Sequence, residues 1–381
     1  MTGEPLPDGV YLGLPEEVYF DQPRLGSSDF ATLYSKREGW WWQSRHNPHL
    51  EPRSSKATEF GSALHKLLLE GPAAYREAFA VAPDQKKFPG VLVTVPDITG
   101  ALTAAGVEFN PKARKHDLVQ LAVAYLDAPV WDHILAAFER KARGRQVISA
   151  ADDFALQTMR NAALEDPDMS VVVNASELQR LTEVSVLWTS EQGLPMRFRF
   201  DCMLPSWNVD LKSIGNIRKE LDYAVGDAVA TYHLDVQLAL SFEARQAAYA
   251  LIRAGSLHGG TEDQRAFLSQ FPDRAPLRGP DGAVQWHWLW MFYQKPDDKG
   301  DAPVIFPVRV FHGDERHRIG WRKAEIAKAF YLEAVARFGL DRPWTRVDPM
   351  HDANHTGERR VKFPPWENLP GPVEGEDEAF S

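Results

Sequence analysis

The stretch RFRFDCMLPSWNVDLKS, from Arg197 to Ser213, decides the fold that we expect. Polar and apolar residues alternate on both sides of a Pro-Ser pair, which favours two short strands, residues 196–203 and 207–213, joined by a tight turn. In the first strand this alternation places Phe198, Phe200 and Cys202 on one face. The sequence therefore predicts a β-hairpin with one apolar and one polar face.

The polar faces of these strands carry two carboxylates and one amine. Asp210 and Lys212 are two residues apart in one strand, so their side chains point the same way. In a hairpin, Asp201 near the end of the first strand lies beside Asp210. A preceding strand, residues 181–188, adds Glu183 on the opposite phase to its apolar residues. Three adjacent strands are thus expected to present charged groups together.

This set of groups suits the hydrolysis of a phosphodiester. Carboxylate oxygens are the ligands that Mg²⁺ or Mn²⁺ prefers, and a lysine beside them can orient the attacking water or neutralise the developing charge. An isolated Asp-x-Lys tripeptide is more often part of a solvated hairpin, because it occurs by chance in most long chains. The motifs around it decide between the two interpretations.

Six motifs occur in an order that resembles the RecE-type exonucleases of phages and prophages, over about residues 19–310. They are LGSSDF (25–30), EFGSALHKLLLE (59–70), TE (182–183), RFD (199–201), DLKS (210–213) and YHLDVQ (232–237). The resemblance implies a restriction-endonuclease-like (PD-(D/E)xK) α/β core, in which helices flank a mixed central sheet, plus a small helical insertion.

The resemblance also implies a role for each site residue. It makes Lys212 the catalytic lysine, Glu183 an assisting carboxylate, and Gln237 a residue on the helix behind the site. The hypothesis that follows is water-mediated cleavage with Mg²⁺ or Mn²⁺, in which the metal ligands are His65, Asp201, Asp210 and the Leu211 carbonyl. The family pattern has an aromatic residue four positions after the glutamine, whereas this chain has Ser241.

The implied activity is degradation of one strand of duplex DNA from its 5′ end, generating single-stranded DNA for recombination. The implied partners are a single-strand annealing protein of the RecT type and further copies of the chain in a ring. Two alternatives stay open: an endonuclease or structure-specific DNA nuclease of the same fold, and a non-catalytic DNA-binding or assembly protein. Comparing linear with covalently closed circular DNA as the substrate would distinguish an endonuclease from an exonuclease.

Two of these residues can also be interpreted without the family. His65 lies off the centre of a helical apolar stripe, with Gly61 one turn earlier leaving room for an ion or for backbone. A single histidine on a helix is more often structural than a ligand. Gln237 follows His233 by one turn on a long apolar run, residues 224–254, so either could face the site. The family order favours His65 and Gln237.

The composition of the chain excludes some kinds of site and disfavours others. The 381 residues include one cysteine, so neither an internal disulfide nor a four-cysteine iron–sulfur cluster can form. No apolar run is long enough to span a bilayer and no secretory signal is evident, so we expect no membrane role and a cytoplasmic location. The net charge of −10 argues against non-specific attraction to DNA. Any attraction must be local, and basic segments occur at residues 112–115, 140–145 and 316–328.

The chain divides into four expected parts. Residues 1–93 form the N-terminal helical part of the nuclease domain, which carries the motif histidine. Residues 94–145 form a helical insertion similar to a SAP module, with helices over 98–105 and 116–125, which either contacts DNA or only packs. Residues 146–340 form the catalytic core, including strands over 286–294 and 304–311 and a helix over 318–338. Residues 341–381 form a Pro-rich, acidic tail.

Overall fold

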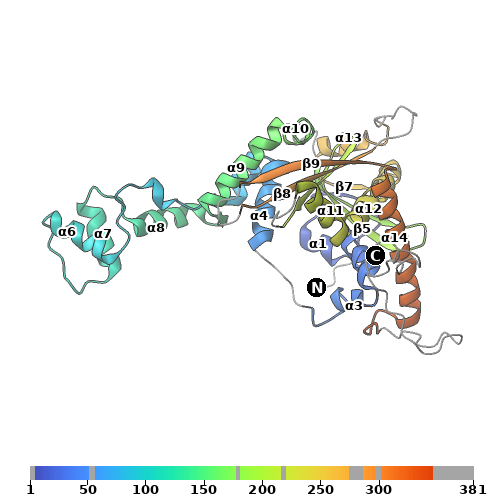
Figure 1. Ribbon diagram of the computed structural model, residues 1–381, viewed down its shortest axis with the longest axis horizontal. Coiled ribbons are helices and arrows are strands. Elements are labelled where there is room, and N and C mark those ends of the chain that lie inside the picture. The colour runs from blue at the N-terminus through green and yellow to red at the C-terminus, as the bar shows by residue number, and fades with distance from the viewer. Residues whose placement is uncertain are drawn as a thin grey trace, which may run out of the picture.

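The computed structural model describes residues 5–50, 56–176, 181–215, 220–273, 286–296 and 302–345. A mixed sheet of seven strands, in the order β7-β1-β4-β5-β6-β8-β9, forms the centre, and helices flank it (Figure 1). The strands are β1 (Gly9–Leu12), β4 (Leu181–Thr189), β5 (Pro195–Met203), β6 (Trp207–Ser213), β7 (Leu257–Gly259), β8 (His287–Gln294) and β9 (Val304–Phe311). The predicted α/β class with a mixed central sheet is confirmed.

The strand pairing confirms the predicted hairpin. β4, β5 and β6 are antiparallel neighbours, and β6 pairs in parallel with β8, which in turn pairs antiparallel with β9. A parallel pair needs a crossover connection, and here the chain between β6 and β8 supplies it through helices on one face of the sheet. The strands that carry the predicted site residues therefore lie side by side in the middle of the sheet.

Two helical layers cover the sheet. The side chains of β8 divide between two apolar clusters, one on each face of the sheet. Trp288, Trp290 and Phe292 belong to the first cluster, and the alternate residues belong to the second. The first cluster is closed by α2 (Ser27–Lys36), α12 (Leu234–Arg253) and α14 (Glu315–Phe338). The second is closed by α4 (Lys56–His65), a π-helical turn (Lys66–Glu70), α9 (Ala150–Glu165) and α10 (Pro167–Val173). Shorter helices complete the core: α1 (Glu16–Asp21), α3 (Gly39–Gln43), α5 (Pro72–Ala78), α11 (Leu221–Thr231) and α13 (Glu262–Ser269).

The long helix predicted over residues 224–254 is two helices, α11 and α12. They are separated at Tyr232 and His233, where His233 has a φ of 52°. A left-handed residue cannot continue a right-handed helix, so the chain turns here. His233 then faces the Tyr34 ring and the Lys323 amine, 3.4 Å away, whereas Gln237 points toward the sheet. Of the two residues, Gln237 is the one that contacts Asp210.

The predicted common face of Phe198, Phe200 and Cys202 is wrong at its last member. Phe198 and Phe200 lie in the first apolar cluster, but Cys202 packs with Val209 in the second. β4 and β5 keep their register across this point, and Glu183, opposite the break, has a φ of 55°. A positive φ at a residue other than glycine interrupts the pleat, so the side-chain phase changes here.

A separate group of helices extends from the core along the long axis of the molecule (Figure 1). It consists of α6 (Val95–Ala104), α7 (Lys115–Tyr125) and α8 (Trp131–Ala142), and its apolar cluster is its own. The chain leaves and returns through a parallel pair, β2 (Phe79–Val81) and β3 (Gln146–Ile148). The two helices predicted here are present, and residues 94–145 stay our proposed insertion. Among the described residues, none of the helices is both long and apolar enough to cross a bilayer.

Candidate active site

Asp210 of β6 is the most deeply buried carboxylate of the site, with 1% of the residue exposed. Its Oδ1 accepts hydrogen bonds from Lys212 Nζ, at 2.9 Å, and from Gln237 Nε2, at 2.8 Å. Its Oδ2 is buried and has no hydrogen-bond partner in the part of the chain that the structure describes. A buried polar oxygen without a partner is unfavourable, so this atom is a candidate ligand position.

Burial controls the charges of this pair. Loss of solvation raises the pKa of Asp210 to about 7, against the lowering effect of the Lys212 amine, and nearby Asp201 raises it further. Burial alone would lower the pKa of Lys212, but the carboxylates of Asp210 and Asp201 outweigh it, so the net shift is upward. Lysine therefore stays charged, while the aspartate needs additional positive charge to ionise fully.

Asp201 lies where β5 and β6 stop pairing. The register joins Cys202 to Val209, which would place Asp201 opposite Asp210 in the next pair. The backbone hydrogen bonds between the strands do not continue to this pair, and the Asp201 carboxylate instead accepts a hydrogen bond from the Leu211 backbone N–H at 3.2 Å. Where the two strands stop pairing, Asp201 and Leu211 line an open cavity.

His65 and Glu183 form a second pair beside the two aspartates. His65 Nε2 lies 3.3 Å from Glu183 Oε1, without the alignment of a hydrogen bond, and Arg199 Nη1 donates to Glu183 Oε2 at 3.3 Å. Burial raises the pKa of Glu183, with Asp201 adding to the rise while His65 and Arg199 oppose it. His65 ends α4 where the helix widens into the π-helical turn, a distortion that is frequent at functional sites.

Gly61 leaves room for a side chain, rather than for the ion or backbone that we predicted. A Cβ at this position would lie 2.6 Å from the Tyr293 hydroxyl of β8, so the space beside Gly61 is filled by tyrosine. Only glycine allows this close approach of α4 to the sheet.

Ser241, at the position where the family pattern has an aromatic residue, is buried in α12. Its hydroxyl donates to the Leu238 carbonyl at 2.6 Å.

One open cavity of about 1020 Å³ joins most of these groups. His65, Glu183, Asp201 and Leu211 line it, together with three basic residues, Lys66, Arg197 and Arg199. Lys212 lines an adjoining cavity of about 520 Å³, which shares Ser213 and Tyr293 with the first and also contains Tyr232 and Lys295. Glu16 and Glu70 also line the first cavity, so its four carboxylates offset its three cationic side chains, whereas the charged residues of the second cavity are Lys212 and Lys295.

The donor chemistry fits a hard divalent cation. Asp210 Oδ2 and His65 Nε2 are buried without hydrogen-bond partners among the described residues. These atoms, with Asp201, are oxygen and imidazole ligands of the kind that Mg²⁺ or Mn²⁺ takes. Within the described ranges, however, no three His, Cys, Asp or Glu side chains form a preassembled metal-binding group.

Sequence reasoning missed three residues that border the site. Arg199 fixes Glu183 and, through Nη2, the Leu14 carbonyl at 2.8 Å. Its signal was present, since it shares the polar phase of Asp201 in the first strand. Tyr293 and Tyr232 gave weaker signals, because one lies in a strand dominated by tryptophan and the other at an unpredicted helix break.

Comparison with known proteins adds little. No family model matches the chain, and no curated protein matches it. A solved structure from Eubacterium rectale, described as a putative exonuclease, is similar over 70% of this chain and 82% of its own length, with 14% identity and a TM-score of 0.31. At that identity and TM-score the likeness carries no argument about this chain, and the site geometry has to carry the functional conclusion.

Proposed function

We propose that this chain is a metal-dependent DNA nuclease of the PD-(D/E)xK type that degrades duplex DNA from its ends. The observation that carries the proposal is the contact of Asp210 with both Lys212 and Gln237, beside Asp201, in the middle of a mixed sheet. Structural ion pairs also occur in buried sheets. This one differs because it retains an unpartnered carboxylate oxygen, and because its neighbours Asp201 and Leu211 line an open cavity.

Each residue has a role in this proposal. Asp210, Asp201 and His65, with the Leu211 carbonyl, would hold Mg²⁺ or Mn²⁺. The bound ion would polarise the phosphoryl oxygen and lower the pKa of an attacking water. Lys212 neutralises the charge that develops on the phosphate, and Gln237 holds the Asp210 carboxylate in place. Glu183 accepts a proton or orients the water, while Arg199 fixes its side chain.

The choice of substrate rests on the cationic side chains along the two adjoining cavities and on the motif order. Lys66, Arg197 and Arg199 border a cavity large enough for a strand of nucleic acid, and attraction to phosphate can be local although the chain is acidic. The action on ends, the 5′-to-3′ direction, the ring and the annealing partner of the RecT type rest on the resemblance to RecE-type exonucleases. Recombination is the process that these properties serve.

A digestion experiment tests the proposal. Purified protein with Mg²⁺ should release nucleotides from linear duplex DNA, leave covalently closed circular DNA intact, and lose activity in a chelator. Duplexes labelled at the 5′ or the 3′ end give the direction, and the mass in solution gives the oligomer. Exposed Lys86 provides a matched control, because Lys86→Ala should keep full activity whereas Lys212→Ala should not. Cleavage of closed circles would favour an endonuclease, and intact linear DNA would favour a non-catalytic DNA-binding protein.

A further inference from the structure

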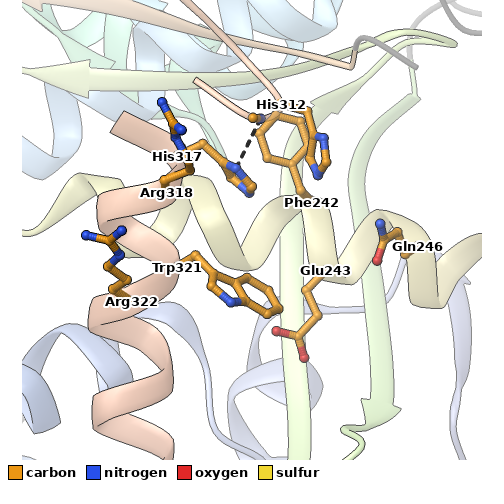
Figure 2. A pocket seen from close by; sticks show the side chains of 9 residues that line it. Phe242, Glu243, Gln246, His312, His317, Arg318, Trp321 and Arg322 are labelled. Atoms are coloured by element: carbon orange, nitrogen blue, oxygen red, sulfur yellow. Dashed lines mark hydrogen bonds between the residues drawn. The ribbon is translucent and has the colours of Figure 1, made fainter. Parts of the chain in front are cut away.

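A second pocket lies on the far side of α12 from the sheet, between α12 and α14 (Figure 2). Its volume is about 340 Å³, at the lower end of the range for small-ligand sites. The wall is aromatic: Phe242 lies 5.1 Å from both His312 and His317, which are 4.6 Å apart. Trp321 projects from α14 toward Glu243, and 41% of it is exposed. An exposed tryptophan beside an aromatic slot marks a binding surface.

The rim of this pocket has unbalanced positive charge. Most basic residues of the segment 316–328 have acidic partners: Arg316 and Lys323 bind Asp235, and Lys328 binds Glu243 at 2.8 Å. Arg318 and Arg322, one turn apart on α14, have no acidic partner in the described part of the chain. Because Lys328 neutralises Glu243, the pocket suits a large apolar side chain followed or preceded by carboxylates.

The chain itself contains such a segment. Residues 374–381 read EGEDEAFS, with four acidic residues among the six positions before Phe380. The described chain ends at Thr345, just after Trp344, which is buried against the C-terminal half of α14. From there, the 17 residues of α14 between Trp321 and Phe338 span about 26 Å at 1.5 Å per residue. The 35 residues from Thr345 to Phe380 can span at most about 115 Å, at about 3.3 Å per residue.

The segment is therefore long enough to reach the pocket of its own chain, and its tether raises its effective concentration there. We propose that residues 374–381 of this chain dock into the pocket between α12 and α14. In this arrangement Phe380 enters the aromatic slot beside Trp321, and the acidic residues before it pair with Arg318 and Arg322. The acidic segment is then held on the face of α12 opposite Gln237, away from the candidate active site.

The experiment uses the full chain and a fluorescent peptide that corresponds to residues 370–381. A neutral-tail variant carries Phe380→Ala together with Glu374→Gln, Glu376→Gln, Asp377→Asn and Glu378→Gln. The peptide should bind this variant saturably in fluorescence anisotropy. If its Kd is about 0.1 mM, a tethered tail at an effective concentration of about 1 mM weakens peptide binding to the wild-type chain about tenfold.

Two substitutions in the neutral-tail background locate the site. Trp321→Ala and Arg318→Gln/Arg322→Gln should each weaken peptide binding at least tenfold. The matched controls are Phe154→Ala, which removes another exposed aromatic residue, and Arg337→Gln, which removes an exposed charge at the other end of α14. Unchanged melting temperatures confirm that each variant is folded. The charge-assisted part of binding should also weaken with added salt.

Several results would overturn the proposal. No saturable binding to the neutral-tail variant up to about 1 mM peptide, ten times the expected Kd, would remove the site. Equal affinity for wild type and neutral-tail variant would show that the tail does not occupy it. Full binding by the Trp321→Ala variant would place the peptide elsewhere. A concentration-dependent mass for wild type that the neutral-tail variant lacks would move the docking to a second copy, which contradicts the intramolecular form.

Discussion

Replacing Asp210 by asparagine should stabilise the metal-free protein while it removes the proposed activity. Asparagine has the same shape and keeps an oxygen that can accept the hydrogen bonds from Lys212 and Gln237. It loses the negative charge, which burial disfavours. The protein is therefore expected to trade stability for a site that holds positive charge, a common relation at functional sites.

The magnitude follows from the pKa of this carboxyl. Its folded-state pKa is about 7 and its ordinary value is 3.8, a rise of about 3 units, or about 4 kcal/mol at most. A raised carboxyl pKa means that stability is fully present below pH 4 and is lost as the pH rises through 7. Relaxation around the group reduces the effect to about 2 kcal/mol at pH 8. An unfolding entropy of about 0.8 kcal/mol/K for this chain converts 2 to 4 kcal/mol into about 2 to 5 °C in Tm.

Thermal unfolding at pH 8, with a chelator and then with Mg²⁺, measures the effect. In the chelator Asp210→Asn should melt above the wild type at pH 8, and at pH 5 the difference should fall to less than half. Mg²⁺ should raise the Tm of the wild type more than that of the variant. Asp127→Asn, at an exposed carboxylate, controls for net charge and should shift neither value. A variant that melts below the wild type in chelator at pH 8, or gains equally from Mg²⁺, refutes the reasoning.

Three further changes test the surroundings of the site and of the second pocket. Gln237→Leu removes the amide that binds the buried Asp210 carboxylate. Nuclease activity should therefore fall at least tenfold, and the Mg²⁺ concentration that gives half of the maximal activity should rise. An unchanged Mg²⁺ titration of the activity would contradict this role. Gly61→Ala should destabilise the protein by about 1 to 3 kcal/mol in denaturant unfolding, because the new methyl group meets the Tyr293 hydroxyl. Adding Tyr293→Phe should restore part of that loss. A Gly61→Ala variant as stable as the wild type would show that α4 and β8 are not in tight contact here. Burial lowers the pKa of His317 to about 4, with His312 contributing, and its Nδ1 accepts the Gly313 N–H, so the neutral form is the folded one. Its stabilisation is present above pH 6.5 and lost as the pH falls toward 4. Because solvent screens part of the effect, the wild type should lose about 1 kcal/mol more than His317→Gln between pH 7 and 4.5, and equal losses would contradict the assignment.

The sheet was predictable where one face of each strand is apolar. Alternation located the strands 207–213, 286–294 and 304–311, and it placed Asp210 and Lys212 on one side of β6. It failed at Glu183, because a positive φ at a residue other than glycine has no sequence signature and shifts the side-chain phase of Cys202. It also failed at His233, where a left-handed residue divides a continuous apolar run into two helices.

The site was predictable in its residues and not in its contacts. The structure brings together Asp201, Asp210, Lys212 and Gln237, and it pairs His65 with Glu183. Which atoms pair, and which stay unpartnered, depends on packing between elements far apart in the chain. The Tyr293 hydroxyl at Gly61 is one example, since the two residues are 232 positions apart and meet only when α4 covers β8.

Cleavage by wild type and by Lys212→Ala tests the central claim most directly. Both proteins are incubated with end-labelled linear duplex DNA and Mg²⁺, and nucleotide release is followed with time. Loss of a charge that stabilises the transition state is expected to reduce the rate at least a hundredfold. The account predicts digestion by the wild type, that loss in the variant, and equal DNA binding by both. Equal cleavage by both proteins, or none by the wild type, would contradict it.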